Sequence, residues 1–308
     1  MKSTRDGYGQ GLVKAGEKNQ QVVVLTADLT ESTRVTSFKE KFPERFFECG
    51  VAEQNMMGMA AGLALSGKIP FVSSFAVFSP GRNWEQLRLS VCYSQANVKI
   101  VGSHGGITVG PDGASHQALE DLAITRVLPN LAVIVPCDFR EAEKATLAAA
   151  SYAGPVYLRL SREKTPVITK EEFSFEIGKS QVFREGKDIT LIGCGPVLVQ
   201  VLKAAEVLAE KEKIEVEVIN CPTIKPLDKT TILTSVKKTS KVVSIEDHQV
   251  IGGLGSAIAE LLVEELPLPM LRLGIPDVFG ESGTDKELLA KYNLDSFGIV
   301  KRIKDKFF

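Results

Sequence analysis

Two histidines and an aspartate share one glycine-rich stretch of the sequence, His104-Gly-Gly-Ile-Thr-Val-Gly-Pro-Asp112-Gly-Ala-Ser-His116. Imidazoles and a carboxylate can bind a metal ion or form directional hydrogen bonds with a polar substrate. A metal centre is disfavoured, because no H-x-H or H-E-x-x-H spacing places two imidazoles on one face and nearby Asp121 does not complete a ligand set. The stretch therefore favours recognition of a small polar substrate.

A single glutamate, Glu53, lies where an expected helix begins. From position alone, an acid in a first helical turn is a favourable partner of the helix dipole or a cap. Its neighbours point to a different role, because the segment Gly50-Val-Ala-Glu-Gln-Asn-Met-Met-Gly-Met is mostly apolar. A carboxyl in an apolar pocket can share a proton with a buried base. Glu53 is therefore a candidate proton-transfer group.

Two other glycine clusters are weaker candidates for anion binding. Gly193-Cys-Gly195 ends an expected strand and opens a helix, but Leu198 stands where a third glycine of a dinucleotide site belongs, and the next strand ends in Asn220 rather than an acid. Gly252-Gly-Leu-Gly255 precedes another helix and is equally well explained as a turn. No G-x-S-x-G segment occurs, which disfavours a serine hydrolase.

Short β-branched runs that alternate with helical stretches must position these residues, and this rhythm is typical of a parallel sheet flanked by helices. The expected strands of the first half cover residues 22–26, 69–73, 98–101 and 132–136, and its expected helices cover 56–65 and 140–152. In the second half we expect strands at 188–193, 215–219 and 241–245 and helices at 197–211 and 256–265.

The alternation stops between the two halves, which predicts two α/β domains, each with a mostly parallel sheet flanked by helices. We place the first domain at residues 1–165, a linker at 166–187 and the second domain at 188–308. A chain of 308 residues is long enough for two ordinary cores.

Composition narrows the class of partner. The formal net charge of -1 predicts neither nucleic-acid nor membrane binding. The five cysteines are scattered without a C-x-x-C pair, which fits reduced thiols better than disulfides. No secretion signal or membrane-spanning apolar run is evident, so we expect a soluble, cytoplasmic protein.

The run G-V-A-E-Q-N-M at residues 50–56, with S-F-A-V-F at residues 74–78, resembles the pyrimidine-binding domain of transketolases. In that family the matching glutamate hydrogen-bonds the aminopyrimidine ring of thiamine diphosphate and favours the tautomer that removes the thiazolium proton. The resemblance implies that Glu53 is catalytic and binds the cofactor. It also implies that Phe78, with Phe75 beside it, packs against the pyrimidine ring.

The resemblance extends to A-D-L-T-E-S at residues 27–32 and to the start of the chain. It implies that Asp28 lies near the thiamine and that Ser32 contacts the phosphate of a sugar substrate. Arg5 falls at the spacing of the family's phosphate-binding arginine. Each of these residues taken singly could be a cap or a surface charge.

The most specific part of the resemblance is the spacing of His104, Asp112 and His116. It implies that these residues bind substrate hydroxyls, with His116 nearest the reacting carbon and therefore catalytic. The L-S-R pattern at residues 160–162 implies that Arg162 grips the substrate phosphate, for which a forked guanidinium is well suited.

Similar segments continue through the second half, including T-I-K-P-L-D from residue 223 and L-G-I-P-D-V-F-G from residue 273. That domain binds neither substrate nor cofactor directly in the family. Ser79-Pro80-Gly81 departs from the family's aromatic cluster, which leaves open whether Arg82 or Trp84 forms the pocket wall there.

A G-D-G segment, which holds Mg²⁺ and the cofactor's diphosphate in an N-terminal domain of full-length relatives, does not occur here. The resemblance therefore implies the C-terminal subunit of a split transketolase, with an N-terminal partner subunit that holds Mg²⁺. We expect a heterotetramer with two copies of each subunit, acting on sugar phosphates.

Two alternatives remain open. One is a related thiamine enzyme, either the β subunit of a 2-oxo acid dehydrogenase or a deoxyxylulose-phosphate synthase fragment. The other is a non-catalytic assembly subunit that keeps the fold.

Overall fold

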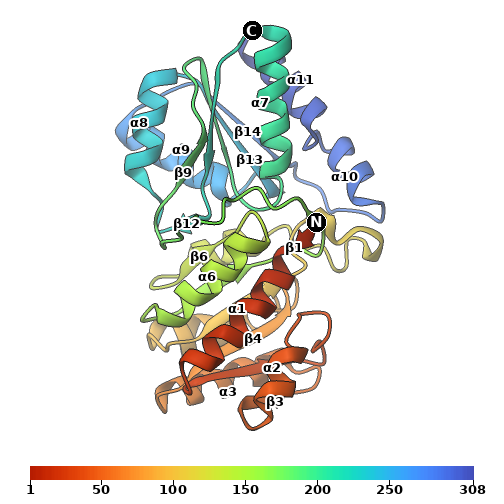
Figure 1. The fold of residues 1–308 in the computed structure, drawn as a ribbon, viewed down its shortest axis with the longest axis vertical. Helices are drawn as coiled ribbons and strands as arrows, with labels where there is room; N and C mark the ends of the chain where they lie inside the picture. The colour runs from red at the N-terminus through yellow and green to blue at the C-terminus, as the bar shows by residue number, and fades with distance from the viewer.

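The computed structural model describes residues 1–308 and contains two α/β domains, seen one above the other in Figure 1. The first has a seven-stranded sheet in the order β12-β6-β7-β5-β4-β2-β3. Its parallel strands are β2 (Val22–Thr26), β3 (Phe46–Glu48), β4 (Ile69–Phe75), β5 (Lys99–Ser103), β6 (Ala132–Ile134) and β7 (Val156–Arg159). The antiparallel edge strand β12 (Thr223–Lys225) comes from the second half of the chain.

Helices cover both faces of this sheet, because its strands are apolar on both sides. Successive residues of β2 alternate between two cores, with Val22 and Val24 packed on α1 and α6, and Val23 and Leu25 packed on α3. The helices are α1 (Thr4–Lys18), α2 (Thr36–Lys41), α3 (Glu53–Leu65), α4 (Trp84–Gln86), α5 (Asp121–Arg126) and α6 (Phe139–Ser151), with a π-helical turn at Leu87–Tyr93 and 3₁₀ turns at Pro43–Arg45 and Ile107–Asp112.

The second domain has a five-stranded sheet in the order β14-β13-β10-β11-β9. Its strands are β9 (Gln181–Arg184, antiparallel), β10 (Ile189–Gly193), β11 (Val216–Asn220), β13 (Val242–Gln249) and β14 (Met270–Ile275). Its helices are α7 (Leu198–Glu212), α8 (Lys229–Thr239), α9 (Leu254–Glu265), α10 (Asp285–Lys291) and α11 (Ser296–Phe307). The predicted fold class, two mostly parallel α/β domains, is confirmed.

The boundary between the domains is more intertwined than the sequence indicated. Within the predicted linker 166–187, β9 joins the second sheet. Farther along the chain, in the second half, β12 joins the first sheet. A short pair of strands, β1 (Lys2–Ser3) and β8 (Lys164–Thr165), ties the start of the chain to the end of the first domain. The domain limits stay a prediction, but the two halves share packing.

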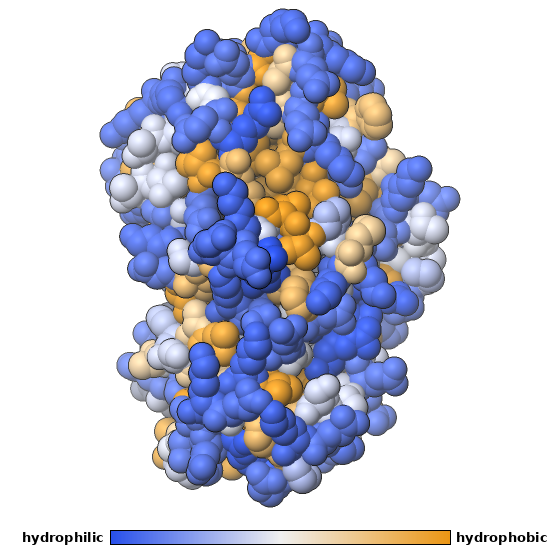
Figure 2. Space-filling view, viewed as in Figure 1, coloured by the Kyte–Doolittle hydropathy of each residue, from blue (hydrophilic) through white to orange (hydrophobic).

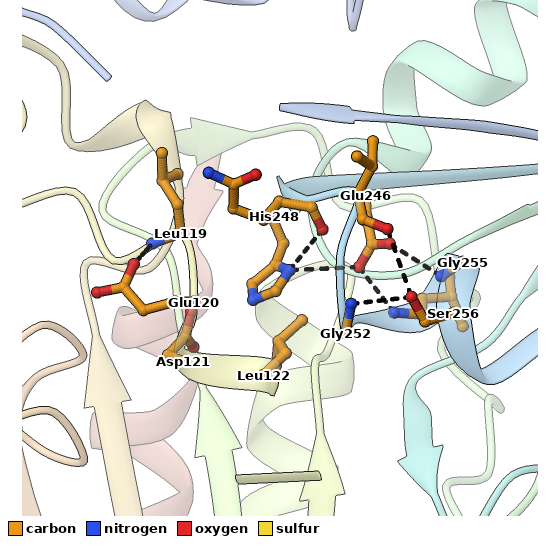
Figure 3. A network of polar contacts seen from close by, with 12 residues as sticks. Leu119, Glu120, Asp121, Leu122, Glu246, His248, Gly252, Gly255 and Ser256 are labelled. Atoms are coloured by element: carbon orange, nitrogen blue, oxygen red, sulfur yellow. Dashed lines mark hydrogen bonds and ion pairs between the residues drawn. The ribbon is translucent and has the colours of Figure 1, made fainter. Parts of the chain in front are cut away.

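A buried polar network joins the domains. Arg159 at the end of β7 pairs with Asp121 at 2.8 Å, and both side chains are almost inaccessible to solvent. Figure 3 shows the His248 ring between the Glu120–Leu122 segment of the first domain and Glu246 of β13. The His248 Nδ1 donates to the Gln249 carbonyl at 2.8 Å.

His248 should make stability depend on pH. Burial lowers the pKa of this imidazole to about 4, against an opposing effect of Asp121. The pKa of His248 is lower in the folded than in the unfolded state. Its contribution to the free energy of unfolding is therefore complete above about pH 6.5 and is lost as the pH falls through 4. Glutamine does not titrate, so we expect the free energy of unfolding of His248→Gln to rise relative to that of the wild type as the pH falls from about 6.5 to 4. The expected change is on the order of 3 kcal/mol. Denaturant unfolding of both proteins at several pH values measures the difference, and a pH-independent difference would contradict this expectation.

The surface in the view of Figure 2 is mostly hydrophilic, with an apolar area over the second domain in the region of α7. The five cysteines are all free thiols, four of them buried. None of the helices combines the length and apolar character needed to span a bilayer.

Candidate active site

The carboxyl ends of the parallel strands in the first sheet bring the predicted residues together. Phe75 is the last residue of β4, His104 follows β5, and Arg162 lies shortly after β7. Ligand sites in open α/β sheets form at this edge because consecutive strands end side by side.

Four predicted residues form one aromatic cluster. The Phe75 and His104 rings stack with centroids 3.8 Å apart, and the Phe75 and Phe78 rings stack at 5.9 Å. The His116 ring meets Phe78 edge-on at 5.5 Å and Phe75 at 6.1 Å. The two histidines, separated by twelve positions in the sequence, therefore both contact Phe75, and His116 also contacts Phe78.

His104 is held as a neutral hydrogen-bond acceptor. Its Nε2 lies 3.4 Å from the Arg5 Nη1, and its Nδ1 lies 2.8 Å from the Ser103 hydroxyl. Because a guanidinium can only donate, Nε2 accepts and Nδ1 carries the hydrogen. Burial, assisted by the positive charges of Arg5 and Arg162, lowers the pKa of His104 to about 3. The imidazole is therefore uncharged at neutral pH.

Three arginines surround this histidine and create an anion-binding environment. Arg5 donates to the Ser32 carbonyl at 2.9 Å, so Ser32 enters the site through its backbone. Burial lowers the pKa of Arg5, and the charges of Arg34 and Arg162 lower it further. Arg34 is held by Asp6 at 2.9 Å. Positive groups this close to one another favour an anionic ligand between them.

Arg34 was not among the residues predicted from the sequence. It lies two residues after Ser32, the last residue of the A-D-L-T-E-S run, and Asp6, which holds it, follows Arg5 directly. Asp6 and Arg34 carry opposite charges, and each lies close in sequence to a predicted site residue. This pattern is a signal that could have identified Arg34.

Arg162 and Asp112 form a second, more open part of the site. Arg162 donates to the Val109 carbonyl at 2.6 Å and lies 3.8 Å from the Asp112 carboxylate, with both side chains about 40% exposed. Asp112 thus pairs with the predicted phosphate-binding arginine. Both groups can still turn toward a ligand, because their ion pair is long and partly solvated.

Glu53 is buried, and its carboxylate faces the guanidinium of Arg82. Its carboxylate accepts from Arg82 at 3.2 and 3.3 Å, although only 3% of its side chain is exposed. Met56 and Met57, in the same helix, are fully buried, whereas Val51 is 70% exposed. Gly50 adopts a left-handed φ of +64°, and the chain turns so that Val51 faces outward.

Arg82 also lies over the Phe78 ring, with its guanidinium carbon 4.1 Å from the ring centroid. It therefore links the carboxylate of Glu53 to the aromatic cluster. Trp84, the other candidate for the pocket wall, instead donates to the Ile124 carbonyl at 2.7 Å and is tied to α5. Of the two candidates that follow Ser79-Pro80-Gly81, only Arg82 lies over Phe78.

Asp28 is not brought into the cluster by any side-chain hydrogen bond or ion pair. It is exposed, has a φ of +59°, and its backbone N–H donates to Glu48 at 2.7 Å. Glu48 also accepts from Thr30 at 3.0 Å and so shapes the turn after β2. The predicted role of Asp28 beside a cofactor stays a prediction.

Two models of known protein families match the chain. Residues 1–167 match the pyrimidine-binding domain of transketolase, and residues 178–299 match the transketolase C-terminal domain.

Two relatives match over nearly their whole length. A Methanocaldococcus jannaschii protein, provisionally named a transketolase C-terminal section, is 49% identical over 99% of this chain and 96% of its own. A 6-deoxy-6-sulfo-D-fructose transketolase subunit from Clostridium sp. (strain MSTE9) is 42% identical over 96% of this chain and 92% of its own.

Longer and solved relatives complete the comparison. Human transketolase is 38% identical over 98% of this chain, which spans only 48% of it. A solved structure described as a split gene transketolase, inactive beta4 tetramer, has a TM-score of 0.93 at 46% identity and covers 99% of this chain and 98% of its own. This chain thus corresponds to about half of a full-length relative.

Proposed function

The chain belongs to the transketolase family, as a C-terminal section, and we propose that it is one subunit of an enzyme that transfers a two-carbon ketol unit from a ketose phosphate to an aldose phosphate. One observation carries this proposal. An unbroken series of contacts runs from Glu53 through Arg82 and Phe78 to His116, and on through Phe75 and His104 to Arg5. A proton-transfer carboxylate and an anion-binding cluster thereby form two ends of one site.

The residues at the carboxylate end fit the aminopyrimidine of thiamine diphosphate. Arg82 presents a flat group with N–H donors to Glu53 and to the face of Phe78 at the same time. An aminopyrimidine is also flat, and its ring nitrogen can share a proton with the Glu53 carboxyl, so it could take both positions once Arg82, whose side chain is half exposed, turns away. When bound, the cofactor supplies the carbon nucleophile that carries the two-carbon unit.

The chain's own residues then have separable tasks. Glu53 holds a proton at a ring nitrogen of the cofactor, and Phe78 fixes the tilt of the ring. His116 exchanges a proton with a substrate hydroxyl near the reacting carbon. Neutral His104 accepts a hydrogen bond from another hydroxyl at Nε2 once Arg5 turns from this nitrogen to the anion. Phe75, which is buried and contacts both imidazoles, keeps water from their rings.

The arginine cluster of Arg5, Arg34 and Arg162 would grip the anionic end of the sugar. The free energy gained when the arginines bind this anionic end is used to orient the reacting carbon at the other end of the sugar. The names of two relatives support an anionic sugar: one is a 6-deoxy-6-sulfo-D-fructose transketolase subunit, and another, 36% identical, is one chain of an apulose-4-phosphate transketolase. When the anion binds, Arg162 leaves its ion pair with Asp112, and Asp112 forms a hydrogen bond with a substrate hydroxyl.

A partner subunit is part of this proposal, as is Mg²⁺ held by that partner with the cofactor's diphosphate. The solved split-gene relative is described as an inactive beta4 tetramer. The outer face of α3, directly after Glu53, also presents apolar side chains and bare backbone. Met59 and Leu65 are 39% and 70% exposed, and no atom lies within 4 Å of a Cβ built at Gly58 or Gly62. We propose that the N-terminal subunit packs there, in a complex with two copies of each chain.

Reconstitution with the N-terminal subunit tests the reaction class. With thiamine diphosphate and Mg²⁺ present, the complex should consume xylulose 5-phosphate in the presence of an aldose phosphate and leave pyruvate unchanged. Turnover of pyruvate would favour a 2-oxo acid enzyme instead. A complex that binds the cofactor but converts no sugar phosphate would favour a non-catalytic subunit.

A further inference from the structure

We propose that Asp247, a residue of the C-terminal domain, is a positioning residue for substrate binding. It fixes the segment between His104 and His116, which we call the substrate loop. The inference rests on the proposed function and extends it, because it gives the C-terminal domain a part in forming the site.

The two carboxylate oxygens of Asp247 each hold one residue of the substrate loop. Oδ1 accepts from the Ile107 backbone N–H at 2.9 Å, and Oδ2 accepts from the Thr108 hydroxyl at 3.1 Å. The side chain is buried, with 8% of its surface exposed. Hydrogen bonds to a buried, charged acceptor are stronger than those between neutral groups.

The loop fits closely against this carboxylate. Gly106 has a φ of +88°, and a Cβ at that position would lie 2.1 Å from the Asp247 Oδ2. Ile107 is fully buried in the hydrophobic core of the C-terminal domain, in one cluster with Leu191 and Ile245. The substrate loop is thus anchored in the other domain by both a polar and an apolar contact.

Asp247 is itself held rigidly at the end of β13. Side chains alternate along a strand, so its neighbours Glu246 and His248 face the opposite side. Figure 3 shows these two side chains next to each other. Glu246 accepts from the backbone N–H groups of Leu254 at 2.7 Å and Gly255 at 2.8 Å. The strand end is therefore fixed from one side while it fixes the loop on the other.

The contacts continue from the loop to the anion-binding cluster. Val109, the residue after Thr108, accepts from Arg162 at 2.6 Å through its carbonyl. Without the hydrogen bonds from Ile107 and Thr108 to Asp247, the Val109 carbonyl would no longer be held in place. Arg162 would then lose the acceptor that positions it. Glu53 and Phe78 lie outside the loop, on α3 and after β4. Asp247 should therefore affect substrate affinity and leave cofactor affinity unchanged.

The reconstituted complex provides the test, with Asp247→Ala, Asp247→Asn and Thr108→Val. Asp247→Ala should raise the KM for xylulose 5-phosphate about tenfold, since two hydrogen bonds to a charged group are lost. The affinity for thiamine diphosphate should stay within about twofold. Asp247→Asn should recover most of the loss, because an amide can accept from Ile107 and donate to Thr108. Thr108→Val, which removes one bond, should have a smaller effect of about threefold.

Asp228→Asn is the matched control, because Asp228 is a buried aspartate of the same domain that caps α8 and holds Ser180. It should change stability without changing KM. This comparison separates positioning of the loop from general loosening of the domain. If Asp247→Ala does not fold, Thr108→Val still decides, because a wild-type KM in Thr108→Val would overturn the inference.

Binding of inorganic phosphate, measured by calorimetry, separates this inference from the proposed reaction. Weaker phosphate binding in Asp247→Ala, by about tenfold, supports the positioning role even if the wild-type complex transfers no ketol unit. If the wild-type complex is active while Asp247→Ala keeps its KM and its phosphate affinity within about twofold, the positioning role is wrong and the proposed function stands.

Discussion

Replacing Glu53 by glutamine is expected to lower ketol transfer by the reconstituted enzyme about a thousandfold, within the range of a lost general acid–base group. Glutamine has the same size and can still accept from Arg82, so the helix start and the fold should be kept. It cannot hold the proton that the carboxylate shares with the cofactor ring. Single-turnover and steady-state rates with xylulose 5-phosphate measure the loss.

Glu264→Gln is a suitable control for the Glu53 variant, because it makes the same chemical change at an exposed position in the C-terminal domain. It should have wild-type activity. Calorimetry of thiamine diphosphate binding distinguishes a catalytic defect from a binding defect. Near-normal turnover in Glu53→Gln would mean that this carboxylate is not the activating group.

Replacing Arg162 by alanine is the second change with a large expected effect. A hydrogen bond to a charged group contributes roughly 1.5–3 kcal/mol, so kcat/KM for a phosphorylated acceptor should fall about 10- to 150-fold. The same variant should use glycolaldehyde, a hydroxylated aldehyde without a phosphate, almost as well as the wild type. The ratio of the two kcat/KM values is the measurement that checks this role.

Arg302→Ala removes a comparable side chain from the exposed face of α11 and should leave that ratio unchanged. If Arg162→Ala lost the same factor with both aldehydes, the arginine would act on the fold or on the shared chemistry. A role in gripping the anionic end of the substrate would then be excluded.

Much of the fold follows from local patterns in the sequence. The expected strand at 22–26 has the observed bounds of β2, and the expected helix at 140–152 differs from α6 by a single residue at each end. Buried parallel strands are short apolar runs, and such runs are easy to recognise. β12 was not expected, because its three residues carry no strand pattern and pair only with a distant domain.

The candidate site was predictable where residues follow neighbouring parallel strands. The stacking of Phe75, Phe78, His104 and His116 agrees with the grouping that the resemblance implied. The contacts of Arg82 and Asp247 were not predictable. Arg82 reaches Glu53 across 29 positions, and Asp247 reaches Ile107 across 140. Such contacts depend on how turns and domains pack, which no local pattern encodes.

The most direct test of the shared site is a titration of this chain with its N-terminal partner. We measure ketol transfer from xylulose 5-phosphate at saturating thiamine diphosphate and Mg²⁺. The isolated chain should show no turnover, and activity should rise with added partner until the two chains are equimolar. Full activity of the isolated chain, or no activity at any ratio, would contradict the account.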